Sequence, residues 1–329
     1  MKTGWKITFL AFSSIIITFL APSAGMDFIL PTGFSSPLHK EIYLQLRLPR
    51  VLTAFSAGAG LSLCGMVFQA LFRNPLADPY TLGIASGASC GAALTVILGF
   101  TGSLFGMPMV TMGAFAGSVC ATVLLFGFAA LRRSVDKLTL LLAGVALSFL
   151  FSSLLMFFQY LSDPHDSFYI IRWLMGGLET VGYRPFFSIL PFETIGTAII
   201  LLQLPQLDHL LTGDDIARSR GVNIRRTRTL LLSATTLMVG AVVAVCGPIG
   251  FIGLIVPHIC RSVFSWKHVW AGPATALSGG TLLVIADTVA RTMAAPAEIP
   301  VGVITALLGA PFFLWILFRS TGNGKSHVM

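Results

Sequence analysis

Long apolar stretches follow one another along nearly the whole chain, with only short polar interruptions between them. One α-helix needs about 20 mostly apolar residues to cross the hydrocarbon core of a bilayer. Hydrophobic residues make up 55% of the chain and charged residues only 10%, whereas soluble domains carry about 25% charged residues. A water-soluble fold cannot bury that much apolar surface, and the sequence therefore predicts an all-α, multi-pass membrane protein.

The spacing of the apolar stretches predicts ten membrane-spanning helices in one transmembrane domain that covers residues 1–329. The predicted spans are 5–25, 51–71, 81–99, 108–130, 138–161, 186–204, 229–247, 250–265, 271–290 and 300–318. The first span also has the basic start, apolar run and small residues of a cleavable signal peptide. We interpret it as a retained helix, because the topology that follows from the basic residues requires it.

Lysine and arginine residues are distributed unequally between the two sides of the predicted bundle. With a cytoplasmic start, only six of the 21 Lys and Arg residues fall outside: Lys40, Arg47, Arg50, Arg172, Arg184 and Arg291. The others fall inside, which satisfies the positive-inside rule with both termini in the cytoplasm. The net charge of +8 is dispersed between apolar runs rather than concentrated on one face, so nucleic acid is not an expected partner.

Proline and glycine interrupt the apolar stretches in two places, 74–79 and 247–257. These interruptions hold the residues that we expect to be structural: Asn74, Pro75, Asp78, Pro248 and Pro257. A proline removes a backbone donor and bends or ends a helix, which in a membrane is tolerated where protein or water satisfies the freed groups. We therefore expect these breaks to line an aqueous path or a subunit contact.

Three arginines bracket the outer ends of predicted spans. Arg47 and Arg50 lie one helical turn apart, and Arg291 follows the ninth span. Asp287 lies four residues before Arg291 on the same helix, so the two side chains can form an ion pair. An arginine excess on the side where positive charge is disfavoured indicates an acidic counterpart. The alternatives are a purely structural pair and interfacial anchoring.

The longest polar interruption is 206–228, which combines Gly213, Asp214 and Asp215 with a basic stretch at 218–228. Its length and mixed charge predict short surface helices. A solvated loop whose arginines only set the topology is the first interpretation. A platform that docks a partner protein is the second.

The sequence contains no catalytic constellation and no expected metal site. Its five cysteines form no Cys-x-x-Cys pair, and we interpret them as small core residues. The tail at 322–326 ends like a nucleotide-binding loop, but Arg319 occupies the position of the required first glycine. We therefore expect a non-enzymatic chain, and any ATP would be hydrolysed by another chain.

Seven segments together form a specific pattern. In order along the chain they are 47–50, 74–79, 142–147, 173–177, 247–258, 286–291 and 308–312. As a set they resemble the FecCD-type permeases, which are the membrane subunits of ABC importers for iron-siderophores, haem and cobalamin. A similar start at Arg50 and Arg228, each followed by a span that ends in Cys-Gly, is also typical of the inverted repeats of transporters.

The resemblance implies a type II importer permease with an inverted repeat, ten helices per subunit, and a bacterial cytoplasmic-membrane location. It further implies a homodimer or a closely paired permease embedded in membrane lipid. Two ATPase subunits, which bind ATP and Mg, would lie on the inner side. A periplasmic or lipid-anchored substrate-binding protein would dock on the outer side. The chain itself would bind no cofactor.

The resemblance also implies roles for individual residues. The outer arginines would contact glutamates of the binding protein, and loop 206–228 would hold the coupling helices. These residues are Arg47, Arg50 and Arg291 for docking; Gly213, Asp214, Asp215, Ala217 and Gly221 for coupling; Ser86 and Thr139 for an inner gate; and Asp287 as a structural residue. The coupling stretch departs from the family at Ser219-Arg220-Gly221, where a leucine more often precedes the glycine.

We expect the cargo to be an iron(III)-siderophore-type chelate, with haem or cobalamin as the alternatives. An ion-coupled secondary transporter is the alternative of another class. Such a transporter would normally place carboxylates near the bilayer centre. Among the carboxylates of this chain, Glu193 is the one expected to lie deep.

Overall fold

The computed structural model describes residues 2–25, 28–29, 36–100, 102–104, 106–131, 137–178 and 181–322. Its elements are α1 (Lys2–Leu20), η1 (Ala21–Ser23), α2 (Pro37–Glu41), η2 (Ile42–Arg47), α3 (Leu48–Phe72), η3 (Pro79–Leu82), α4 (Ile84–Ile97), β1 (Ser103–Leu104), β2 (Met107–Pro108), α5 (Met109–Leu131), α6 (Lys137–Leu161), α7 (Pro164–Leu174), α8 (Arg184–Leu211), α9 (Asp214–Ser219), α10 (Ile224–Cys246), α11 (Ile252–Val263), α12 (His268–Met293) and α13 (Val301–Gly322). Arg132, Arg133 and most of the tail at 322–326 lie outside the described residues.

Each of the ten predicted spans coincides with a helix. Among the described residues, seven helices are long and apolar enough to cross a membrane, and three shorter apolar helices accompany them, at Ile84–Ile97, Ile252–Val263 and Val301–Ile316. The largest boundary difference is at α8, which continues through Pro205 to Leu211, whereas the predicted span ends at 204. The all-helical, polytopic fold class is confirmed.

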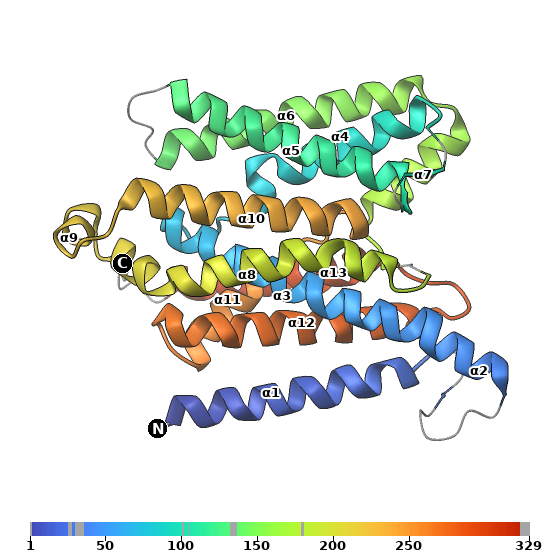
Figure 1. Ribbon diagram of the computed structural model, residues 1–329, viewed down its shortest axis with the longest axis horizontal. Coiled ribbons are helices and arrows are strands. Elements are labelled where there is room, and N and C mark those ends of the chain that lie inside the picture. Colours follow the sequence, from blue (N-terminus) through green and yellow to red (C-terminus); the bar gives the residue numbers. More distant parts are fainter. Residues whose placement is uncertain are drawn as a thin grey trace.

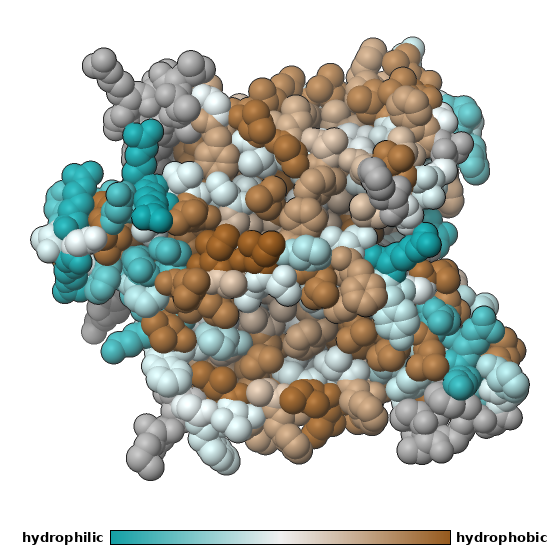
Figure 2. Space-filling view, in the orientation of Figure 1, coloured by the Kyte–Doolittle hydropathy of each residue, from teal (hydrophilic) through white to brown (hydrophobic). Residues whose placement is uncertain are grey.

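The long helices lie side by side along one common direction (Figure 1). The start of α1 and the short helix α9 lie at one end of the bundle, and α2 and α7 lie at the other. Hydrophobic residues cover most of the middle of the visible face, while hydrophilic residues gather at the two ends (Figure 2). The common direction is therefore that of the membrane normal, and we call the α9 end the inner end and the α2 end the outer end.

Helix α3 forms the centre of the packing. The most apolar 18-residue window of the helical segment that contains α3 is 78% buried, whereas that of α6 is 11% buried. Helices α8, α10, α11 and α12 all pack against α3. Since α3 is apolar on all sides and is covered by protein, it is a core helix, while α6 presents an apolar face to lipid or to a partner subunit.

Small residues allow α4 and α5 to approach closely. A Cβ atom built on Gly91 would overlap the carbonyl oxygen of Gly113, and one built on Gly117 would overlap that of Gly87. Backbone therefore lies directly on backbone along this contact. In lipid, hydrophobicity does not drive helices together, and such close van der Waals packing takes its place.

Replacement of Gly91 by alanine is expected to destabilise the protein by about 1–3 kcal/mol, because the added methyl group forces two backbones apart. Gly127→Ala in α5 is the matched control, since a Cβ atom there would meet nothing within 4 Å. The control should be neutral or stabilising by up to about 1 kcal/mol, because alanine favours helix. Thermal unfolding in detergent measures both, and equal melting temperatures would contradict the close-packing interpretation.

The cysteines follow the sequence expectation with one exception. Cys64, Cys90, Cys246 and Cys260 are buried, whereas Cys120 is exposed. Cys120 lies on α5, a largely apolar helix with several exposed residues. Apolar periodicity alone cannot distinguish its lipid-facing positions from core positions.

Candidate functional sites at the two ends

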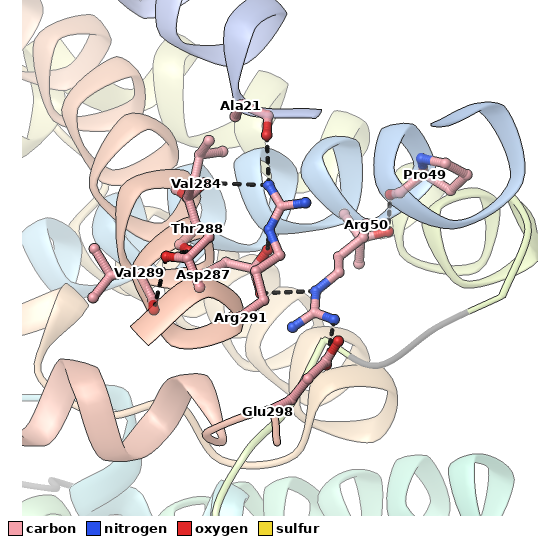
Figure 3. Close-up of polar contacts among 11 residues, drawn as sticks. Ala21, Pro49, Arg50, Val284, Asp287, Thr288, Val289, Arg291 and Glu298 are labelled. Carbon is pink, nitrogen blue, oxygen red and sulfur yellow. Dashed lines mark hydrogen bonds and ion pairs between the residues drawn. The ribbon is translucent and has the colours of Figure 1, made fainter. Parts of the chain in front are cut away.

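Four charged side chains meet at the outer end of the bundle, where α3 and α12 pack together (Figure 3). We call Arg50, Asp287, Arg291 and Glu298 the outer ion-pair cluster. Arg50 Nε lies 2.9 Å from Asp287 Oδ1, and Arg50 Nη1 lies 2.7 Å from Glu298 Oε2. Arg291 Nε lies 3.6 Å from Asp287 Oδ2, so the ion pair predicted within this helix is present. The side chain of Asp287 is 0% exposed and that of Glu298 is 40% exposed.

The outer arginines also hold the segment that follows α1. Arg291 Nη2 donates to the carbonyl oxygen of Ala21 at 2.6 Å. Arg47 Nη1 lies 3.4 Å from the carbonyl oxygen of Pro22 and 3.3 Å from that of Ser23. Arg47 and Arg291 therefore connect the segment after α1 to the start of α3 and to α12, which stabilises the outer end of the fold.

The structure supplies an acidic counterpart for these arginines within the chain itself. Sequence reasoning found Asp287 because it lies four residues from Arg291, but missed Glu298, which is 248 residues from Arg50. Helical periodicity relates only residues of one helix, so it gave no signal for that pair. Arg50 and Arg291 are buried, and Arg47 is half-buried. Docking of a binding protein by these arginines stays a prediction.

At the inner end, α9 and its two flanking glycines form the segment that sequence reasoning assigned to coupling. The expectation of a short surface helix is confirmed. Gly213 precedes it at φ +127°, a conformation that residues with a Cβ rarely adopt. Ala217 is fully buried, whereas the side chain of Asp215 is 99% exposed. The five predicted coupling residues therefore do not share one surface, because Ala217 packs inward while Asp215 faces outward.

Asp214 ties α9 to the inner ends of α3 and α10. Its two carboxylate oxygens each lie 2.8 Å from Arg228 Nη2 in the first turns of α10. Arg73, just after α3, approaches Asp214 Oδ1 at 3.5 Å and donates to the carbonyl oxygen of Leu210 in α8 at 2.6 Å. Sequence reasoning counted Arg73 and Arg228 among the basic residues of the inner side and used Arg228 as the start of a repeat, but it paired neither with Asp214. Neither shares a helix with Asp214, so spacing could not reveal the contact.

The first predicted break, 74–79, is a compact turn. The Asn74 side chain accepts from the backbone N–H of Leu76 at 2.9 Å, and the Asp78 side chain accepts from that of Tyr80 at 3.2 Å. Burial raises the pKa of Asp78 to about 6. The hydroxyl of Tyr80 in turn accepts from the backbone N–H of Ile249 at 2.9 Å, which brings the two predicted breaks together.

The backbone around the second break, 247–257, is paired with and packed against other parts of the chain. The backbone N–H of Gly177 donates to the carbonyl oxygen of Cys246 at 2.8 Å, and a Cβ atom on Gly176 would overlap that of Pro248. Pro257 lies inside α11 and is buried. Non-helical backbone at membrane depth is thus covered by protein, which is one of the two conditions under which it is tolerated. The structural roles of these prolines and of Asn74 remain a proposal.

The two predicted gate residues lie on neighbouring helices but at different depths, because Gly83, just before α4, packs against Leu147 and Ser148 of α6, more than two turns beyond Thr139. Ser86 is in the first turn of α4 and Thr139 in the first turn of α6, and these helices pack against each other. The Ser86 hydroxyl donates to the carbonyl oxygen of Gly83 at 3.1 Å, within its own turn. Both residues are partly buried, and a gate at this place stays a prediction.

Glu193 is buried in the middle of α8, as the sequence predicts. It contacts Gly60 of α3, where an added Cβ atom would overlap its carboxylate. Its Oε1 atom has no hydrogen-bond partner within the described part of the chain. No group of three or more His, Cys, Asp or Glu side chains among the described residues could hold a metal ion.

Comparison with known proteins identifies the family. The model of the FecCD transport family matches residues 7–319. The chain is 41% identical over 307 residues to the vitamin B12 import system permease of Salmonella paratyphi A, covering 93% of this chain and 92% of that one. It is 41% identical over 284 residues to the hemin transport system permease of Yersinia pestis, covering 85% and 84%.

Solved structures agree with this assignment. A structure described as a metal-chelate type ABC transporter in an inward-facing conformation superimposes with a TM-score of 0.84 and 32% identity, covering 94% of this chain and 98% of that one. PsaBC from Streptococcus pneumoniae in complex with Fab has a TM-score of 0.57 at 17% identity, covers 85% and 91%, and shows the fold alone. The chain therefore belongs to the FecCD transport family, and it is the non-catalytic, multi-pass permease subunit of an ABC importer of the bacterial inner membrane.

Proposed function

We propose that this permease forms the path by which a metal chelate of the iron(III)-siderophore type crosses the inner membrane. The observation that carries the proposal is the match, over 94% of the chain, to a structure described as a metal-chelate type transporter. The curated relatives named for hemin and vitamin B12 support the wider class and provide the two alternative cargoes. Family membership sets aside the ion-coupled alternative, although Glu193 is buried as that alternative requires.

The proposal includes an assembly in which residues 1–329 form one transmembrane domain that pairs with a second copy or a similar permease. Importer membership implies ATPase and binding-protein partners. The exposed apolar face of α6 supports the pairing, since lipid or a second subunit must cover it. Two ATPase subunits at the inner end would supply ATP and Mg chemistry, and a periplasmic or lipid-anchored binding protein would deliver the cargo at the outer end.

Transport would follow from a shift between two helix arrangements, each favoured by one state of the ATPase pair. The inner segment 213–221 is the proposed contact with the ATPase, and Asp215 is its most exposed charge. Asp214 would transmit the movement, because its ion pairs reach the inner ends of α3 and α10. Ser86 and Thr139, on the packed helices α4 and α6, would form the inner gate.

Uptake by proteoliposomes that contain the permease and its ATPase tests the proposal. Vesicles loaded with ATP should take up a ferric siderophore presented by the binding protein, and an ATPase with an inactivated catalytic site should abolish uptake. Parallel assays with haem and cobalamin identify the cargo. Uptake that persists with the inactive ATPase and an ion gradient would overturn the pump mechanism.

Reversal of Arg47 to glutamate is expected to weaken docking of the binding protein about tenfold at low ionic strength, with a smaller effect in high salt. Arg47 is the suitable outer arginine because Arg50 and Arg291 are buried in the cluster. Lys40→Glu in α2 is the control, since it makes the same charge change at an exposed position of the outer end. A titration of binding protein onto nanodisc-embedded permease measures both, and equal affinities for the two variants would count against a docking role of Arg47.

A further inference from the structure

A cavity of about 480 Å³ opens at the inner end, between the last turns of α8 and the first turns of α10. The lining residues that matter here are Gln206, His209, Arg220, Asn223, Arg226 and Thr227. None of the residues that line it is acidic, and two are arginines. Arg220 and Gly221, the last residues of the coupling segment, line the cavity, whereas the exposed Asp215 does not.

The arginines of the cavity are available to an anion. Arg220 Nη1 lies 3.2 Å from His209 Nδ1, which orients the guanidinium and leaves its other N–H groups free to donate. Within the described part of the chain, the Arg226 side chain makes no ion pair. Asp214 of the inner segment is held by Arg228 and Arg73 and does not line the cavity.

The backbone adds to this positive potential. Asn223 caps the 23-residue helix α10, and its side chain accepts from the backbone N–H of Arg226 at 3.0 Å. The remaining N–H groups of the first turn carry the positive end of the helix dipole, which favours an anion beside them. The positive end of the α10 dipole and the guanidinium groups of Arg220 and Arg226 therefore both contribute positive potential to this cavity.

The cavity lies at the border between apolar and polar surface. Leu202, just before the cavity on α8, is 73% exposed, and Ile195 two turns earlier is also exposed. Hydrophobic surface over α8 and α10 adjoins the hydrophilic surface around α9 (Figure 2). A ligand with a phosphate group and acyl chains could therefore place the phosphate in the cavity and the chains along α8. Basic pockets between helices on the cytoplasmic side are typical sites for anionic lipid head groups.

We propose that this cavity binds the phosphate of an anionic phospholipid head group from the inner leaflet. The site goes beyond the importer function and does not rest on it. Free phosphate offers the same chemistry without the acyl chains, and the test separates the two sources. A surface of the ATPase is the competing occupant of the cavity, and it is a protein rather than a lipid.

Native mass spectrometry of the detergent-purified full chain, titrated with phosphatidylglycerol or phosphatidylcholine, tests the site. The wild-type chain should bind the first phosphatidylglycerol roughly tenfold more tightly than phosphatidylcholine, as expected for two basic side chains at the membrane surface. The double variant R220Q/R226Q should lose this preference. The control R218Q/R225Q removes the same charge from two exposed arginines that do not line the cavity, and it should keep the preference.

Three results would overturn the proposal. The first is an equal loss in both double variants, which would show a general charge effect. The second is displacement of phosphatidylglycerol by millimolar inorganic phosphate together with no preference over phosphatidylcholine, which would assign the cavity to a free anion. The third is an R220Q/R226Q variant that keeps its lipid preference but assembles poorly with the ATPase. That result would assign the cavity to the ATPase. The titration needs neither ATPase nor binding protein, so its failure leaves the importer function untouched.

Discussion

Asp287→Asn is expected to destabilise the permease by about 3–5 kcal/mol, the largest effect of any single change proposed for this chain. The carboxylate of Asp287 is fully buried between two buried arginines. Asparagine has a similar shape, but it leaves Arg50 with only Glu298 and leaves Arg291 without a carboxylate. Removal of one partner from a buried ion pair leaves an uncompensated charge, which costs more than the pair itself contributes. Thermal unfolding in detergent, followed by size-exclusion chromatography, measures the loss.

Glu298→Gln is the matched control, since it removes a carboxylate from the same arginine. The Glu298 side chain is 40% exposed, so water can replace its contact and the cost should be at most about 1 kcal/mol. Where Asp287→Asn fails to yield folded protein, the double variant Arg50→Met, Asp287→Asn provides a second measurement. It should recover part of the stability, because one of the stranded charges is gone. Equal losses for the two single variants would refute the burial argument.

Length and apolarity were sufficient to predict the ten spans of this fold, but not the short helices α2 and α7. A run such as 138–161 has one compatible structure in lipid, because its backbone groups must be satisfied internally. The prediction was less accurate where a helix extends beyond its apolar run. Helix α8 continues through Pro205 to Leu211, and its last turns carry polar residues that face the inner surface. Pro205 itself is exposed and lines a cavity at the inner end, so neighbouring helices do not cover it.

The candidate sites were predictable only within single helices. Asp287 and Arg291 are four residues apart on α12, and their pairing followed from helical spacing. Tyr80 and Ile249 meet across 169 residues, and no periodicity relates them. For the same reason, the sequence did not predict the ion pair between Glu298 and Arg50. Contacts between helices depend on the packing angles and register of the bundle, which single-sequence patterns do not encode.

The two adjacent aspartates of the inner segment, Asp214 and Asp215, have different surroundings in the structure. Both were assigned to coupling on the strength of the resemblance. Asp215 is almost fully exposed, whereas Asp214 is half-buried and bonded to Arg228 and Arg73. The proposed surface contact with the ATPase and the proposed internal link to the helices therefore fall to two neighbouring residues.

Asp214→Asn is accordingly expected to lower ATP-driven uptake by about tenfold or more while the permease still assembles with its ATPase. The coupling free energy between distant sites is typically 1–3 kcal/mol, which corresponds to about 5–150-fold, and Asp214 is the residue through which α9 reaches both α3 and α10. ATP hydrolysis should continue, because the ATPase contact remains, but with fewer cargo molecules moved per ATP. The measurement is the ratio of cargo transported to phosphate released in proteoliposomes.

Asp215→Asn distinguishes this role from a simple loss of charge on the inner segment. Its side chain is exposed and lies 3.9 Å from Arg218, a distance at which an exposed pair contributes little to stability. We expect this variant to weaken assembly with the ATPase and to leave the cargo-to-phosphate ratio of assembled complexes unchanged. An unchanged ratio in Asp214→Asn, or an equal fall in both variants, would show that the ion pairs of Asp214 do not carry the movement of α9 to the long helices.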